Sequence, residues 1–309
     1  MLMWFPASFC ERSAVRSSRR LRWAAIPIAA TLAFVLAGCT QQQLQGYLPV
    51  GEGGAATNNV DRVVGLWVTS WIVLLVVGVI TWGLMIWAMI VYRRRKGQTG
   101  MPVQLRYNMP IEIFFTIVPL VLVLGFFAFT ARDQTIIETR FATPDVTIQA
   151  FGKQWAWDFN YVNQNVYTSG IQVQPSKDPA APAGSIDPAS IPVLYLPVGK
   201  KVEIQLQARD VIHSFWVIDF LYKKDMIPGR VNYMSFIPER EGTFTGKCAE
   251  LCGEYHSQML FQVKVVSEAE YLAYTQKLKA DGFEGQLGSK YNRNQNLPGV
   301  AAPVIENAK

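Results

Sequence analysis

Residues 63–92 form a run of thirty residues without a single charged side chain. An α-helix needs about 20 apolar residues to cross a bilayer, so this run is long enough to span one. A second apolar run covers residues 113–131 and is bounded by charged residues on both sides. The two runs predict a two-helix transmembrane hairpin over residues 63–131. Two helices are too few for a transport path, so the hairpin is expected to be an anchor or part of a larger complex.

The loop between the two runs indicates how the hairpin is oriented. Residues 93–109 contain five basic residues and no acidic ones. Short loops with an excess of Lys and Arg stay in the cytoplasm. The chain after about residue 131 is therefore expected on the outer face of the membrane.

The N-terminus has the features of an export signal. Five arginines precede an apolar stretch, residues 23–36, that is short for a membrane span. The stretch ends in Leu-Ala-Gly-Cys, which resembles the lipobox of bacterial lipoproteins. We expect residues 1–38 to be a lipoprotein signal peptide, Cys39 to carry lipid, and residues 39–62 to form an exported N-terminal segment. A short anchor or a chance cysteine are the alternatives. The expected location is the bacterial plasma membrane, which the chain crosses more than once.

The formal net charge of +6 raises the question of nucleic-acid binding. From Ala131 onward the chain has 18 Lys and Arg residues against 19 Asp and Glu residues, a balance of −1. The excess of basic residues lies in the N-terminus and in the loop between the spans, where it serves membrane topology. We therefore expect no nucleic-acid partner.

The exported part of the chain predicts an all-β sandwich. Short runs rich in β-branched and aromatic residues recur between turn signals, as in sandwich domains. The clearest of these runs begin at Val146, Val193, Val202, Ser214 and Leu260.

Three other segments of the exported part are not expected to be strands. Residues 175–192 are rich in Pro, Ala, Ser and Asp and predict a surface loop. Ser267 has the pattern of a helix cap, with a helix running to about Ala280. Residues 282–309 have no periodicity and are expected to be irregular. The sandwich domain is thus predicted over residues 132–281.

The stretch CAELCGEYHSQM concentrates metal-binding side chains in a chain with four cysteines and two histidines. It contains Cys248, Cys252, His256 and Met259. A disulfide between the two cysteines is the simplest alternative, but it leaves the histidine and the methionine unexplained. Zinc could use both cysteines with both histidines, yet it does not need the methionine. The haem attachment sequence C-x-x-C-H is absent from the chain.

Copper uses every member of this set. Thiolate, thioether and imidazole together suit a copper centre for electron transfer, and two thiolates can bridge two copper ions. A second imidazole is then needed, and the chain has one other histidine, His213, at the edge of a predicted strand. The ligand interpretation is therefore preferred to a packed core histidine.

Three motifs resemble subunit II of haem–copper cytochrome c oxidase, and the lipobox, the insertion over residues 175–192 and the near-neutral exported part look similar to actinobacterial members. The three motifs are H-S-F-W from His213, D-x-I-P-G-R from Asp225 to Arg230, and C-A-E-L-C-G-x-x-H-x-x-M from Cys248 to Met259. The resemblance covers nearly all of the chain after the signal segment. It implies a cupredoxin-like sandwich with a binuclear copper centre, CuA. The ligands that it implies are His213, Cys248, Glu250 through its backbone carbonyl, Cys252, His256 and Met259.

The resemblance also implies roles outside the copper ligands. The Glu250 side chain would reach a Mg or Mn ion at the boundary with subunit I. Trp155, with Trp157 nearby, would receive electrons, although the residues around them depart from the family pattern at Lys153 and Ala156. Glu112 would stand at the cytoplasmic mouth of a proton channel. Asp225 and Arg230 would contact subunit I.

The function implied is that of the electron-accepting subunit of a terminal respiratory oxidase. CuA would accept electrons from cytochrome c and pass them to haem in subunit I, which holds the haems and CuB, reduces oxygen to water and pumps protons. Expected partners are subunits I and III, membrane lipid, and a cytochrome c donor that is membrane-bound or part of a bc-complex supercomplex.

Other functions fit these residues less well. A quinol oxidase subunit lacks the copper ligands, and a nitrous oxide reductase needs a further histidine-rich domain. A membrane-tethered copper carrier, or a binding module without redox turnover, is the alternative from a different class.

Overall fold

The computed structural model describes residues 40–50, 53–101, 104 and 106–292. The expected signal peptide, residues 1–38, and the expected lipid-bearing Cys39 lie outside these residues. The chain divides into two compact units, residues 1–47 and residues 48–309. In the first unit the structure describes helix α2 (Gln41–Leu44), whose N-cap Thr40 exchanges side-chain and backbone hydrogen bonds with Gln43.

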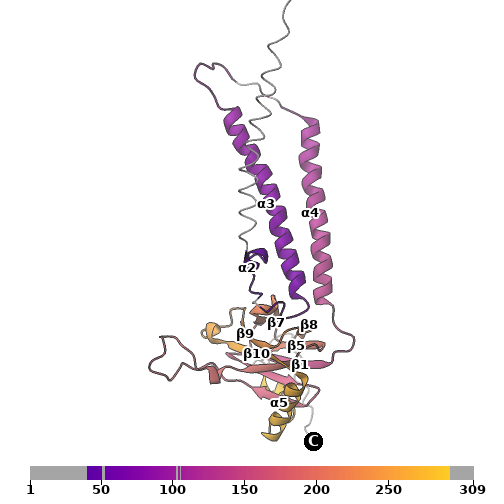
Figure 1. Cartoon of the computed structure of the whole chain (residues 1–309), viewed down its shortest axis with the longest axis vertical. Helices are drawn as coiled ribbons and strands as arrows, with labels where there is room; N and C mark the ends of the chain where they lie inside the picture. Colours follow the sequence, from indigo (N-terminus) through magenta and orange to yellow (C-terminus); the bar gives the residue numbers. More distant parts are fainter. Residues whose placement is uncertain (1–39, 51–52, 102–103, 105, 293–309) are drawn as a thin grey trace, which may run out of the picture. The chain divides into compact units, whose positions relative to one another are not determined.

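The second unit begins with two long apolar helices, α3 (Val60–Val91) and α4 (Met109–Glu138) (Figure 1). Both are long and apolar enough to cross a membrane. In the most apolar stretch of each helix, no residue is buried by the rest of the described chain. Such surfaces need lipid or another protein around them. Both helices extend beyond the uncharged runs. Helix α4 starts early because Asn108 caps it, accepting a hydrogen bond from the Ile111 amide.

The helices are followed by a sandwich of two five-stranded sheets. The first sheet has the order β3-β2-β1-β5-β8. Its strands are β1 (Val146–Lys153), β2 (Ala156–Tyr161), β3 (Val166–Ser169), β5 (Val202–Ala208) and β8 (Asn232–Phe236).

The second sheet has the order β4-β10-β9-β6-β7. Its strands are β4 (Val193–Pro197), β6 (His213–Val217), β7 (Tyr222–Met226), β9 (Gly242–Cys248) and β10 (Leu260–Val266). Each sheet contains one parallel pair, β1 with β5 and β10 with β4. The expected fold class, a helical hairpin followed by an all-β sandwich, is confirmed.

The core of the sandwich is aromatic near its centre. Trp157 and Phe261 have ring centroids 4.7 Å apart, and Phe215 lies 4.7 Å from Phe261. All three side chains are fully buried. Gly246 on β9 makes room for this cluster, since a Cβ atom there would lie 2.3 Å from the Phe261 ring. These rings therefore form a buried aromatic cluster beneath the loop that follows β9, and water does not reach them.

Helix α5 (Glu268–Ala280) packs beside the sandwich. Ser267 caps it by accepting a hydrogen bond from the Glu270 amide at 3.3 Å. Tyr274 of α5 stacks on Tyr195 of β4, with ring centroids 3.8 Å apart. The segment predicted as a surface loop, residues 175–192, contains the short 3₁₀ helix η1 (Pro188–Ser190) and one β-bridge between Pro175 and Ile186, and no strand.

Ion pairs and hydrogen bonds join the ends of the long helices to the sandwich. Arg140, just after α4, forms a two-bond pair with the buried Glu203 of β5, at 2.8 and 2.9 Å. Glu138, the last residue of α4, bonds to Tyr222 and Lys224 of β7. Asn59, the N-cap of α3, donates to the Ser235 carbonyl at 3.2 Å.

Candidate metal centre

Two neighbouring strands supply the framework of the candidate site. His213 is the first residue of β6, and Cys248 is the last residue of β9. The two strands are antiparallel neighbours, with Phe215 opposite Cys248. This register brings the start of β6 next to the loop that leaves β9. The loop then supplies Cys252 and His256 and ends at Met259, where β10 begins.

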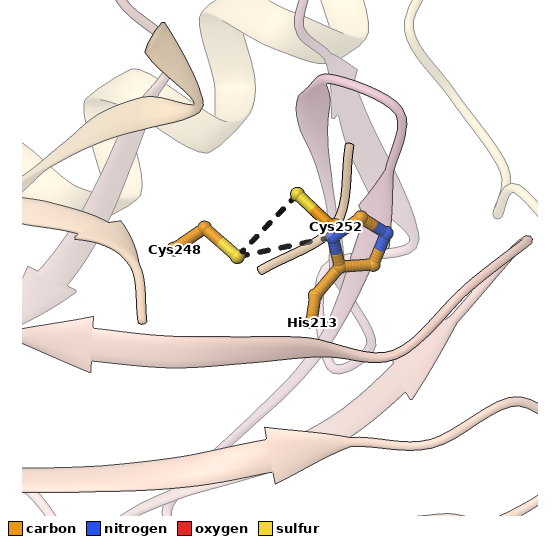
Figure 2. Close-up of side chains that lie close together, drawn as sticks. All are labelled: His213, Cys248 and Cys252. Carbon is orange, nitrogen blue, oxygen red and sulfur yellow. Dashed lines mark hydrogen bonds between the residues drawn. The ribbon is translucent and has the colours of Figure 1, made fainter. Parts of the chain in front are cut away.

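The two cysteines are free thiols that face each other (Figure 2). Their sulfur atoms are 3.9 Å apart, and the Cys248 sulfur is also 3.9 Å from His213 Nδ1. Donor atoms of His213, Cys248 and Cys252 all lie within 4.8 Å of one another. Metal–thiolate bonds are about 2.3 Å long, so one ion can reach both sulfurs. These donor atoms could therefore hold a metal ion, and the two cysteines do not form a disulfide.

The remaining predicted ligands lie around the same two sulfurs. His256 Nδ1 is 3.5 Å from the Cys252 sulfur, and the Met259 sulfur is 3.8 Å from it. The Cys248 thiol donates to the Glu250 carbonyl at 3.2 Å. The structure thus brings together all six residues that were expected from the sequence. This soft donor set of two thiols, one thioether and two imidazoles fits copper.

Asp210 orients His213. Asp210 Oδ1 lies 2.8 Å from His213 Nε2, so a proton on Nε2 leaves Nδ1 as the nitrogen that faces Cys248. Such a carboxylate partner commonly orients a metal-binding imidazole. Gly152 of β1 packs against the His213 ring, because a Cβ atom added at Gly152 would lie only 2.8 Å from His213 Cδ2.

Further hydrogen bonds fix the loop. The other Asp210 oxygen accepts from the Gln154 amide at 2.8 Å, and the Gln154 side chain donates to the Cys252 carbonyl at 2.9 Å. The Met259 carbonyl accepts from the Cys248 amide at 3.0 Å and from the Trp157 indole at 3.4 Å. Sequence reasoning missed the roles of Asp210 and Gln154, since only the fold brings both next to the site.

The titratable groups of the site influence one another. Burial lowers the pKa of His213, but hydrogen bonds with Asp210 and Cys248 outweigh it and raise the pKa above its usual value. Burial would raise the pKa of Cys248, yet the hydrogen bond with His213 and nearby backbone groups bring it below the usual value. Burial and the adjacent Cys248 raise the pKa of Cys252 to about 12. In the metal-free protein the Cys248 thiol is therefore more easily ionised than the Cys252 thiol.

The two tryptophans expected to receive electrons have different environments. Trp155 is half-buried and packs edge-on against Tyr255, with ring centroids 4.9 Å apart. It also covers Gly253 in the loop between β9 and β10, residues 249–259, which is called the ligand loop below. Trp157 is fully buried in the aromatic core. Of these two rings, only that of Trp155 is accessible from outside the domain. The Trp157 ring belongs to the buried aromatic cluster beneath the site.

An open cleft of about 540 Å³ borders the ligand loop and is lined by Ile212, Pro228, Glu250 and Leu251, among others. Glu250 is exposed, and the Leu251 side chain has 79% of its surface accessible.

The other two residues predicted to contact subunit I lie on and near β7. Asp225, on β7 beside β6, has a carboxylate oxygen 3.5 Å from Lys223 Nζ. Arg230 follows this strand and is exposed.

Glu112 lies in the first turn of α4, distant in sequence from the other candidate residues. Its carboxylate accepts a hydrogen bond from the Asn108 amide at 3.1 Å. Asn108 accepts in return from Ile111, so the two side chains cap the helix start. This capping role explains part of the residue's presence at this position.

Comparisons with known proteins identify similar proteins over most of the chain. Residues 146–266 match the protein family described as cytochrome c oxidase subunit II, periplasmic domain. The probable cytochrome c oxidase subunit 2 of Streptomyces avermitilis is 42% identical over 88% of this chain and 92% of its own length. The cytochrome c oxidase subunit 2 of Mycobacterium tuberculosis is 32% identical over 93% of this chain and 88% of its own.

A solved structure with similarity is the periplasmic domain of subunit II of cytochrome oxidase (CoxB) of Bradyrhizobium japonicum. It is 31% identical, with a TM-score of 0.38, and the match covers 45% of this chain and 96% of that one.

Proposed function

The chain belongs to the cytochrome c oxidase subunit II family, and from this we propose that it is the electron-accepting subunit of a terminal respiratory oxidase. A binuclear CuA centre accepts electrons from cytochrome c and relays them to haem in subunit I. Subunit I, with its haems and CuB, reduces oxygen to water and pumps protons. The observation that carries the proposal is the convergence of two free thiols, two imidazoles and a thioether within one site.

The residues that hold copper are proposed to be His213, Cys248, Cys252, His256, Met259 and the Glu250 carbonyl. Copper held by these residues would supply one-electron chemistry, and sharing the electron over two ions would keep the change in each bond length small. The protein supplies a fixed set of donors for this purpose. Asp210 holds the His213 ring, Gln154 holds the Cys252 backbone, and the rings beneath the loop exclude water. Rigid donors in a dry site favour fast electron transfer with little rearrangement.

Trp155 is proposed as the contact for cytochrome c. It is half-exposed and lies on Gly253, directly after the Cys252 ligand, which supports a short path to the metal. Trp157 is buried, and we propose that it supports the site by holding the Met259 carbonyl.

The side of the site near the cleft is proposed to meet subunit I. The exposed apolar Ile212 and Leu251, together with the exposed carboxylate of Glu250, support a protein contact there. The Glu250 side chain is proposed to bind a Mg or Mn ion shared with subunit I. Asp225 and Arg230 are proposed to bond to the same partner.

The remaining proposals concern the membrane. Glu112 is proposed at the cytoplasmic mouth of a proton channel in subunit I. Lipid on Cys39, after removal of residues 1–38, is proposed to anchor the outer end of the chain. The protein is proposed to lie in the bacterial plasma membrane with subunits I and III, with the copper domain, residues 132–281, on the outer face. The donor is proposed to be membrane-bound or part of a bc-complex supercomplex.

Electron paramagnetic resonance of the full chain in detergent tests the copper proposal. After loading with copper, the spectrum should show one electron shared equally by two copper ions. Cys248→Ser and Cys252→Ser should each abolish this pattern, whereas Ser257→Ala, at an exposed position of the same loop, should keep it. A mononuclear spectrum would favour the copper carrier. A Cys248–Cys252 disulfide in protein taken from the native membrane would refute the electron relay.

A further inference from the structure

The described part of the C-terminal tail, residues 282–292, binds along the first sheet. The Phe283 carbonyl accepts from the Tyr167 amide of β3 at 3.0 Å, and the Gly285 amide donates to the Asn165 carbonyl at 2.8 Å. The Phe283 ring packs edge-on against Tyr167 at 5.7 Å. The tail was expected to be irregular. It contains the short 3₁₀ helix η4 (Ser289–Tyr291) and one antiparallel β-bridge, Glu284 with Val166, so its backbone is bonded to the sandwich.

Leu287 is the point where the tail enters the domain. Its amide donates to Asn160 Oδ1 at 3.0 Å, and the same Asn160 side chain donates back to the Leu287 carbonyl at 3.3 Å. Leu287 and Asn160 are both buried. Two hydrogen bonds between one buried side chain and one backbone unit hold the tail in a single register.

The next residues of the tail surround the guanidinium of Arg209, which is almost completely buried. Arg209 donates to the carbonyls of Leu287 and Gly288 at 3.2 and 3.0 Å, and to Asn292 Oδ1 at 3.3 Å. On its other side it pairs with Asp158 at 2.8 Å. A buried cation is stable only when its donors are satisfied, so the tail contributes acceptors that Arg209 needs.

Arg209 directly precedes Asp210, the residue that orients His213. The Arg209 amide also donates to the Gly152 carbonyl at 2.9 Å, and Gly152 lies against the His213 ring. From Asp210 the hydrogen bonds continue to Gln154 and on to the Cys252 carbonyl. A connected series of contacts therefore runs from the tail to two of the proposed copper ligands.

We propose that the C-terminal tail is a positioning element for the copper site. Its carbonyls fix Arg209, the fixed Arg209 holds the segment that carries Asp210, and Asp210 holds His213 and, through Gln154, the Cys252 loop. The tail lies beyond residue 266, where the family match ends. The inference rests on the proposed function for its consequence, but its structural part can be tested without metal.

Amide hydrogen exchange in the metal-free full-length chain is the first test. A chain ending at Asp281 loses the tail, and a matched chain ending at Asn292 keeps all of its described contacts. The amides of Gln154 and Val211 both donate to Asp210 carboxylate oxygens, so they report on this segment. Relative to the full-length chain, hydrogen exchange at these two amides should be about tenfold faster in the chain ending at Asp281 and unchanged in the chain ending at Asn292. Equal rates in the two chains would overturn the proposal.

Two point variants separate positioning from a general loss of stability. Arg209→Gln, with the tail present, should accelerate exchange at Gln154 and Val211 as the deletion does. Leu278→Ala removes a buried side chain of α5 that has no hydrogen bond to Arg209. Hydrogen exchange at the two amides should be slower in Leu278→Ala than in the chain ending at Asp281. The inference fails if Leu278→Ala has the same effect as the deletion, or if Arg209→Gln has none.

Copper provides the second readout. The chain ending at Asp281 should bind copper with an altered hyperfine pattern and reduction potential, while the chain ending at Asn292 and Leu278→Ala should match the unaltered protein. Loss of the copper signal in every variant, including the unaltered chain, would refute the proposed function. The exchange rates would still decide the positioning role.

Discussion

His213 Nε2 and Asp210 Oδ1 lie 2.8 Å apart in a pair that is almost closed to solvent, with 0% and 2% of each residue exposed. The hydrogen bond with His213 lowers the pKa of Asp210 despite its burial, and the same bond raises the pKa of His213. The pair therefore stabilises the metal-free fold only while both groups keep their charges.

The first prediction concerns the pH dependence of this metal-free fold. The Asp210 contribution is present above the unfolded pKa of aspartate and is lost as pH falls through its lowered folded value. The His213 contribution is present below the unfolded pKa of histidine and is lost as pH rises through its raised folded value. Urea unfolding of the metal-free chain should show the pair's contribution between these limits and its loss on both the acid and the alkaline side.

Asp210→Asn should flatten this dependence on both sides. Asp178→Asn, in an exposed loop, is the control and should leave it as it was. If Asp210→Asn kept the full alkaline loss of stability, a group other than His213 would be responsible.

The second prediction uses the close contact between Gly152 and His213. Gly152→Ala places a Cβ atom 2.8 Å from the imidazole, so the ring must move from its position beside Cys248. Copper affinity should fall by about 10–100-fold, as it does when groups that orient metal ligands are changed. Competition with a copper chelator measures this change. Gly83→Ala in helix α3, where a Cβ meets no atom within 4 Å, should leave the affinity unaltered.

The third prediction separates the two tryptophans. Trp157→Ala removes a fully buried ring and should lower the free energy of unfolding by about 3–5 kcal/mol. Trp155→Phe should change stability by less than about 1 kcal/mol but slow the reduction of the copper centre by cytochrome c. Stopped-flow reduction and denaturant unfolding measure the two effects. Equal reduction rates in Trp155→Phe and the unaltered protein would remove Trp155 from the proposed path.

The fourth prediction concerns the electron donor. With a balance of −1 over residues 131–309, the part of the chain that contains the sandwich has little net charge with which to steer a basic cytochrome. Electron delivery should therefore depend only weakly on ionic strength, as expected for a tethered or membrane-bound donor. A steep loss of turnover with a soluble basic cytochrome as salt is added would contradict this.

Much of the fold could be predicted from sequence because its strongest signals are local. Uncharged runs predicted the helices, but the charged ends of α4 remain helical through Asn108 and through bonds from Glu138 to the sandwich. Strand β2 (Ala156–Tyr161) was harder to recognise, since all of its residues are buried and it lacks alternation. The tail has no periodicity because its partners are the side chains of Asn160 and Arg209, which are distant in sequence.

The candidate site shows the same division. Four of the proposed side-chain ligands lie within one dozen residues and have a spacing that is readable directly, and the scarcity of histidine identified the fifth, His213. Gln154 and Asp210 carry no such signal. Their roles depend on the β1–β2 turn and the start of β6 meeting in space, and only the folded chain brings them together.

The strand register that unites His213 with Cys248 also has a consequence for the order of events during maturation. The two residues are 35 positions apart, with β7 and β8 between them. Closing the loop between them costs conformational entropy before the β6–β9 contacts can offset it. An unfolded chain therefore presents the Cys248–Met259 segment without His213 beside it. The complete donor set first exists once the second sheet has closed, so copper bound by all of its ligands is a product of folding and not its nucleus.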